Sequence, residues 1–328
     1  MGFAELIGHS KQIGTLRAAL ANERMHHAYL FLGPDGVGKR MVARALAQAI
    51  HCSEMHGDYC GRCANCAGII DGNHADVRFI GPLPDKKEIS IQQIRELERE
   101  LRFHSFSGKR KIAVIDPVAL MNAAAQNALL KTLEEPPANS LIILIAPNAG
   151  GLLPTLRSRC LRLSFAPLPR AELAAFLQSK HGVKTEDAEF LAAIAMGSIG
   201  AALRLDQEAL IDKRKAWTGM LGSLKSGDYQ GAIAAAEALA ASRDEALEFL
   251  KWAESWYRDL LIYGATSRAD ELVNLDMLPQ IEQRSAASTA DRALAAIAGT
   301  SGAAAGIQRN LNRRMVLEKF LFDVVGGR

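Results

Sequence analysis

Cysteines gathered in one short stretch are the first residues of this chain with an obvious chemistry. They are Cys52, Cys60, Cys63 and Cys66. Zinc in structural sites prefers tetrahedral thiolate ligands, and a C-x2-C turn presents two sulfurs to one ion. Because four protein ligands leave no place for water, we expect structural zinc rather than catalytic zinc. Free thiols or two disulfides are the alternatives. Nearby histidines could substitute as ligands: His51, His56 and His74.

A glycine-rich string, GPDGVGKR, precedes the cysteines and predicts a phosphate loop. Gly33, Gly36 and Gly38 allow backbone N–H groups to converge on phosphate oxygens, and Lys39 adds a positive charge. In such loops the next residue is Ser or Thr, whose hydroxyl binds magnesium, but here it is Arg40. We therefore expect no competent ATP hydrolysis, while phosphate binding stays open.

The acidic end of a later strand bears on the same activity. An ATPase of this kind needs an Asp there for magnesium, usually followed by a Glu that orients the attacking water. The sequence offers Asp116-Pro117, and proline cannot do either task. A second requirement for hydrolysis is therefore missing. Asp116 is also typical of an ordinary turn after a buried strand.

Strands and helices that alternate along the first half must position these residues. Apolar runs predict strands at Ala28–Leu32, Val77–Ile80, Lys111–Asp116, Leu141–Ala146 and Leu161–Phe165. A helix follows Lys39, and a capping box of Ser90 and Gln93 begins another. A further helix over Asn122–Glu135 ends at Pro136. This alternation predicts a parallel α/β sheet covered on both faces.

Helical patterns dominate after Pro167 and Pro169. We predict an α/β domain over residues 1–166 with a zinc module at about 51–74, a small helical domain over 167–207, and a helical domain over 208–328. Helices are expected at Arg170–Lys180, Glu186–Met196, Ile199–Gln207, Glu245–Tyr263 and Ala303–Val325.

Composition places the chain among ordinary globular proteins. Of its 328 residues, 49% are hydrophobic and 23% charged, and the net charge of +3 does not argue for nucleic-acid binding. No apolar run is long enough to span a membrane, and the start, MGFAELIGHS, lacks the pattern of a signal peptide. Clustered cysteines suit a metal site in a reducing compartment, so we expect a cytoplasmic protein.

Several strings occur together in a characteristic order: HAYLFLGPDGVGKR, the cysteine insert, KIAVIDPVALM, QNALLKTLEEPP and LLPTLRSRC. In this combination the chain resembles the clamp-loader branch of the AAA+ ATPases, which includes the clamp-loader subunits of bacterial DNA polymerase III. The resemblance implies an α/β P-loop (AAA+, RecA-like) domain with a zinc-binding insert, then a small α-helical lid and an α-helical collar domain for oligomerisation.

The resemblance also implies a role for Arg159. In that family the arginine of the Ser-Arg-Cys triplet, here Ser158-Arg159-Cys160, acts as an arginine finger on ATP held by a neighbouring subunit. A planar guanidinium suits this role because it neutralises charge on the transferring phosphoryl group and can act in trans. The alternative is a packing motif in which the arginine pairs with a carboxylate.

Other family positions have lost their functional residues. GSIGAAL places Gly200 where catalytic relatives carry an arginine that senses the γ-phosphate, and Arg204 lies one turn later. At the end of LIILIA the polar sensor is replaced by Ala146 and Pro147, with Asn148 as a stand-in. A degraded loop combined with a retained Arg159 indicates a subunit that does not hydrolyse ATP but completes a neighbour's site.

The implied function is loading of a ring-shaped sliding clamp onto primed DNA. Implied partners are motor (gamma/tau) and clamp-opening (delta) subunits in a hetero-pentamer within a DNA polymerase holoenzyme. One alternative is an active motor subunit, which Arg40 and Pro117 disfavour. The other is a zinc-containing DNA-binding protein that uses Lys109-Arg110-Lys111, although no aromatic platform accompanies that cluster.

Overall fold

The computed structural model describes residues 2–204 and 207–326. Contacts divide the chain into two units. The first runs to Phe176 and includes Ala195–Leu203; the second contains Leu177–Ile194 and the chain from Arg204 onward. The three-domain division at residues 166 and 207 remains a prediction, and Leu205 and Asp206, beside its second boundary, lie outside the described residues.

A five-stranded parallel sheet forms the centre of the first unit, as predicted, with strand order β2-β3-β4-β1-β5. Its strands are β1 (Ala28–Leu32), β2 (Val77–Ile80), β3 (Lys111–Ile115), β4 (Ser140–Ala146) and β5 (Leu161–Ser164). Because all pairings are parallel, one edge of the sheet gathers the strands' carboxyl ends and the opposite edge their amino ends. We call these the carboxyl edge and the amino edge.

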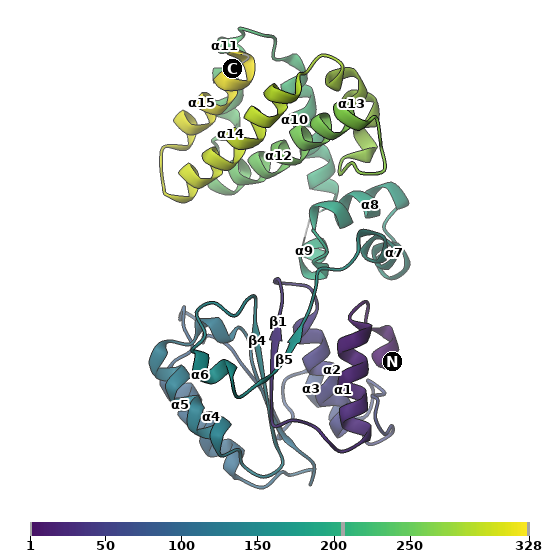
Figure 1. The fold of residues 1–328 in the computed structure, drawn as a ribbon, viewed down its shortest axis with the longest axis vertical. Coiled ribbons are helices and arrows are strands. Elements are labelled where there is room, and N and C mark those ends of the chain that lie inside the picture. The colour runs from purple at the N-terminus through teal and green to yellow at the C-terminus, as the bar shows by residue number, and fades with distance from the viewer. Residues whose placement is uncertain (1, 205–206, 327–328) are drawn as a thin grey trace. The chain divides into compact units, whose positions relative to one another are not determined.

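Helices cover both faces of the sheet (Figure 1). On one side lie α1 (Ser10–Ala21), α2 (Lys39–His51) and α3 (Ala64–Ile70); on the other lie α4 (Ile91–Arg102), α5 (Ala123–Glu134) and α6 (Pro154–Arg157). Successive strand residues alternate between the two cores: Tyr29 packs with α1 and α2, whereas Leu30 packs with α4 and α5. Short 3-10 turns occupy Phe3–Glu5 and Val118–Leu120.

Local signals set the ends of these helices. The predicted capping box is confirmed, since the Ser90 side chain accepts from the Gln93 N–H and the Gln93 side chain accepts from the Ser90 N–H. Asn122 caps α5 by accepting from the Ala125 N–H. Helix α1 was not anticipated, although buried Ile13 and Leu16 stand at helical spacing.

After Ser164, all regular secondary structure in the described residues is helical. The helices are α7 (Arg170–His181), α8 (Thr185–Ile194), α9 (Ile199–Arg204), α10 (Gln207–Ser223), α11 (Tyr229–Leu239), α12 (Arg243–Thr266), η3 (Leu275–Met277), α13 (Leu278–Ser285), α14 (Ala290–Gln308) and α15 (Arg313–Gly326). In the second unit, tryptophans from α10 and α12 pack in one core: Trp217, Trp252 and Trp256.

One helix prediction needs correction. The segment Ala303–Val325 is not one helix, because α14 ends at Gln308 and α15 begins at Arg313. Asn310 between them has φ 62°, a left-handed conformation that Asn tolerates and that a helix cannot continue through. None of the described helices has the length and apolar character needed to cross a membrane.

Candidate functional site

The phosphate loop links β1 to α2 at the carboxyl edge of the sheet, which confirms the predicted P-loop α/β fold. Its glycines are required by geometry. Gly33 has φ 154°, and a Cβ there would lie 2.0 Å from the Phe165 carbonyl oxygen. Gly36 has φ 75°, and its Cβ would lie 2.3 Å from Ser198 Oγ. The loop is therefore packed closely by protein atoms.

Lys39, the phosphate-binding lysine of the motif, is bound to its own loop. Its side chain is only 5% exposed, and Nζ donates to the Gly33 carbonyl and, at 2.7 Å, to the Pro34 carbonyl. Burial lowers the pKa of this lysine, while the nearby carboxylates of Asp35 and Asp116 act in the opposite direction. The ammonium group that would bind a phosphate therefore donates its hydrogen bonds to backbone carbonyls instead.

Arg40 lies beside the carboxylate that would help hold magnesium. Arg40 Nη1 is 3.6 Å from Asp116 Oδ2, and the guanidinium also lies over the Phe79 ring at 5.6 Å. Burial raises the pKa of Asp116, and Arg40 opposes that effect. A side-chain cation thus neutralises the acid that a metal ion would otherwise bind.

The predicted sensor positions make structural contacts instead. The Gly200 N–H donates to the Gly36 carbonyl at 2.9 Å, and Ser198 Oγ donates to the Asp35 carbonyl at 2.9 Å. Exposed Asn148 accepts from the Gly150 N–H within its own turn, at 2.9 Å. Arg204 belongs to the other unit. The sequence strings contained Ser198, but no pattern indicated that it would close the loop.

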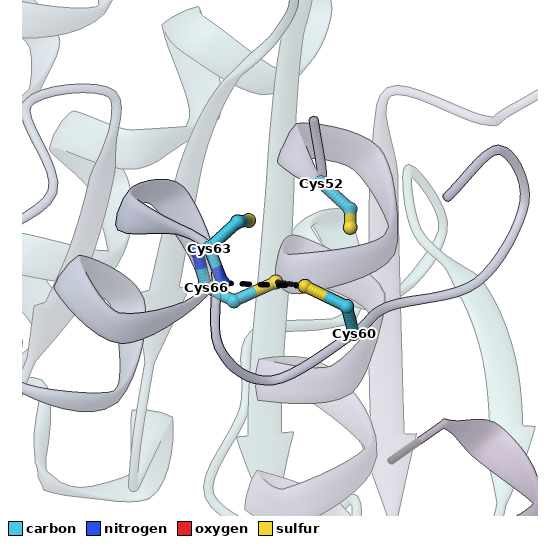
Figure 2. A group of neighbouring side chains, drawn as sticks. All are labelled: Cys52, Cys60, Cys63 and Cys66. Carbon is cyan, nitrogen blue, oxygen red and sulfur yellow. Dashed lines mark hydrogen bonds between the residues drawn. The ribbon is translucent and has the colours of Figure 1, made fainter. Parts of the chain in front are cut away.

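The four cysteines converge as predicted (Figure 2). Their sulfur atoms lie within 4.8 Å of one another, and all four are free thiols. The Sγ atoms of Cys60 and Cys66 are 4.0 Å apart, about twice the length of a disulfide bond. The residues come from the end of α2, the following loop and the start of α3, and they pack in the same core as α1 and α2.

Backbone N–H groups donate to two of these sulfurs. The Cys63 N–H donates to Cys60 Sγ at 3.2 Å, and the Cys66 N–H donates to Cys63 Sγ at 3.5 Å. Burial works to raise the pKa of Cys63, but hydrogen bonds from Ser53 and Cys66 outweigh it and lower the pKa to about 5. This donor set fits a metal that prefers four thiolates.

The nearby histidines form a different group. His51 and His74 cluster with Asp76, whose two oxygens accept from the Ser105 and Ser107 hydroxyls and from backbone N–H groups of residues 106 and 107. His74 Nδ1 accepts from the Asp76 N–H at 3.1 Å. These bonds anchor the loop before β3, while exposed His56 is in neither group.

Arg159 lies at the amino edge, two residues before the first residue of β5. Its Nη2 is 2.5 Å from Glu134 Oε1 and its Nη1 donates to the Thr155 carbonyl at 2.8 Å. A recess of about 560 Å³ surrounds the pair, lined by His26, His27, Leu133, Ser158, Cys160 and Leu161. Burial lowers the pKa of His27. Glu134 was visible in the TLEEPP string, but no spacing rule tied it to Arg159.

The basic cluster before β3 is engaged locally. Lys109 Nζ donates to the Cys52 carbonyl at 3.0 Å, and Arg110 Nη1 donates to the Ser140 carbonyl at 3.5 Å. Lys111 lies 5.8 Å from the centre of the Phe106 ring. Phe103 and Phe106, which precede the cluster in sequence, are 69% and 83% exposed.

Comparisons with known sequences point to subunits of DNA polymerase III. A family model described as "DNA polymerase III, delta subunit" matches residues 8–169, and one described as "DNA polymerase III, delta subunit, C terminal" matches residues 209–325. The DNA polymerase III subunit delta′ of Yersinia pestis is 32% identical over 79% of this chain and 77% of the relative. The Escherichia coli subunit delta′ is 36% identical over 65% of this chain and 64% of the relative. The Haemophilus influenzae subunit tau/gamma is 34% identical over 63% of this chain, but the match spans only 31% of that relative.

Proposed function

Since the chain belongs to the DNA polymerase III delta-subunit family, we propose that it is a delta′-type clamp-loader subunit that does not hydrolyse ATP itself. It supplies Arg159 in trans to a neighbouring ATPase subunit and helps place the sliding clamp on primed DNA. Motor and clamp-opening subunits are its partners in a hetero-pentamer, and the cytoplasm is its compartment.

The placement of Arg159 relative to the chain's own phosphate loop carries the proposal. Leu161 pairs with Tyr29 near the start of β1, whereas Gly33 follows the end of the same strand. A strand of five residues spans roughly 15 Å, so the two sites lie at opposite edges of the sheet. Arg159 is therefore out of reach of a phosphate bound in its own loop, and a neighbouring chain is the proposed source of the phosphate that it meets.

The loop's geometry supports the absence of hydrolysis. Lys39 is bound to loop carbonyls, and Arg40 pairs with Asp116 where magnesium would bind. Pro117 follows Asp116 and offers no group to orient water. An active motor subunit would need a different arrangement at each of these positions.

Zinc is the proposed occupant of the cysteine cluster. Cys52, Cys60, Cys63 and Cys66 would hold it as thiolates, and it would act as a structural crosslink between α2 and α3. The domain division at residues 166 and 207, with a lid and a collar, is part of the same proposal.

The test uses a reconstituted loader in which only the site beside this subunit can turn over ATP. Arg159→Ala should lower turnover at that site by about 10³ or more, since arginine fingers contribute on that scale. Arg162→Ala, at an exposed arginine in β5, is the matched control and should leave turnover unchanged. If Arg159→Ala turned over ATP as fast as Arg162→Ala, Arg159 would have no part in the reaction. Rapid ATP hydrolysis by the isolated subunit would overturn the proposal as a whole.

A further inference from the structure

Glu134 forms an ion pair with Arg159, the residue that is proposed to act on a neighbouring subunit. It is the last residue of α5, and its Oε1 lies 2.5 Å from Arg159 Nη2. The Thr155 carbonyl takes the other terminal nitrogen, Nη1. In the isolated chain, both terminal nitrogens of the guanidinium therefore already have acceptors.

The surroundings of this pair favour an exchangeable contact over a fixed one. The side chains of Arg159 and Glu134 are 33% and 50% exposed, so water reaches both. The adjoining recess of about 560 Å³ gives an incoming group room to approach the guanidinium. An ion pair with this exposure contributes little to folding, because solvent screens it. Its removal should therefore leave the fold intact.

We propose that Glu134 is an internal competitor for Arg159, a carboxylate that the phosphate of a neighbour's nucleotide must displace. Glu134 acts through Arg159, which it contacts directly. The inference rests on the proposed function, since it assumes that Arg159 meets a phosphate in trans.

Charge decides the direction of the effect. A nucleotide's terminal phosphate carries more negative charge than one carboxylate and offers several acceptor oxygens, so it replaces Glu134 when the neighbour docks. Until then the carboxylate neutralises the arginine and weakens its attraction for phosphate. An exposed pair of this kind corresponds to a factor of about 1.5 to 5 in an equilibrium constant.

The experiment compares Glu134→Gln with Glu135→Gln in the reconstituted loader described above. Glu135 is the next residue and is exposed, so its substitution makes the same charge change one position away. Glu134→Gln should lower the KM for ATP at the neighbouring site about 1.5- to 5-fold and leave kcat unchanged. Glu135→Gln should change neither constant.

Two results would overturn the inference. A KM for Glu134→Gln equal to that of Glu135→Gln would show that the carboxylate does not compete. A fall in kcat would show that it orients the arginine for reaction instead. Arg159→Ala, measured in parallel, distinguishes failure of the proposed function from failure of the competitor role. If Arg159→Ala loses turnover while Glu134→Gln matches its control, the proposed function stands and only the competitor role fails.

Discussion

The two edges of the sheet differ in how firmly their cationic side chains are held by other groups of the protein. At the carboxyl edge, the protein's own groups fill the phosphate loop: Lys39 binds loop carbonyls, Arg40 pairs with Asp116, and Ser198 bonds to the Asp35 carbonyl. At the amino edge, Arg159 has a solvent-exposed carboxylate partner and an adjoining recess. The hydrogen bonds of the buried Lys39 ammonium are costly to replace, whereas the exposed ion pair between Arg159 and Glu134 exchanges easily.

The difference indicates which edge would keep a function in a subunit that, as proposed, does not hydrolyse ATP. The strand–loop–helix frame survives at the carboxyl edge because the same glycines and the same lysine serve packing. The amino edge is braced separately. Asp76 anchors the loop before β3, and Lys109 ties that loop to the cysteine cluster at the end of α2.

The largest expected effect contrasts one cation from each edge. Lys39→Met removes the loop's charge and keeps a side chain of similar length, and Arg159→Ala removes the charge at the amino edge. In the reconstituted loader we expect Arg159→Ala to lower turnover at the neighbouring site by about 10³ or more, and Lys39→Met to leave it unchanged. Single-turnover ATP hydrolysis measures both. A comparable loss in Lys39→Met would mean that this chain's own loop takes part in turnover.

The cysteine cluster should make the stability of the protein depend on bound zinc. Cys66→Ala removes one sulfur from the proposed zinc site, and we expect the free energy of unfolding to fall by about 4 kcal/mol, a size typical of a lost structural metal. Denaturant unfolding and metal content by mass spectrometry measure this. Cys160→Ala is the control for loss of a buried thiol outside the cluster. Zinc well below one equivalent in the wild-type protein would contradict the assignment.

The brace at the amino edge predicts a pH dependence. Burial alone would raise the pKa of Asp76, but hydrogen bonds from Ser107, Phe106 and Ser105 outweigh it and lower the pKa to about 2. A carboxyl whose pKa is lower in the folded state stabilises the fold above its unfolded pKa, near 3.8, and loses that contribution as pH falls toward 2. Asp76→Asn should therefore be about 2 kcal/mol less stable than wild type at pH 6, with the gap closing near pH 2. Denaturant unfolding at a series of pH values checks this, and a gap that is constant with pH would contradict it.

Sequence patterns predicted the frame of both edges but not the contacts that distinguish them. The glycine spacing, the cysteine spacing and the apolar runs are local, so the sheet, the loop and the cysteine cluster followed from them. The bond from Ser198 to the Asp35 carbonyl joins residues 163 positions apart, and no local signal marks it. The pairing of Arg159 with Glu134 is also invisible locally, because either residue has other acceptable partners in sequence. Long-range hydrogen bonds of this kind depend on how helices and loops meet across the sheet.

The smallest effect tests how the carboxyl edge is closed. Ser198 Oγ donates to the Asp35 carbonyl and accepts from the Ala201 N–H, at 2.9 and 3.1 Å. Ser198→Ala removes the hydroxyl that both of these backbone groups bond to, so we expect a loss of about 1 kcal/mol in the free energy of unfolding. Ser223→Ala, whose exposed hydroxyl donates to the Met220 carbonyl, should cost less than about 0.5 kcal/mol.

Thermal unfolding of wild type and of Ser198→Ala, with and without ATP and magnesium, then separates two explanations for the closed loop. If protein hydrogen bonds close the loop, nucleotide shifts the melting temperature of wild type and of Ser198→Ala by less than about 1 °C. A larger shift that appears only in Ser198→Ala would mean that Ser198 keeps nucleotide out of a loop that can still bind it, and the carboxyl edge would then be blocked rather than lost.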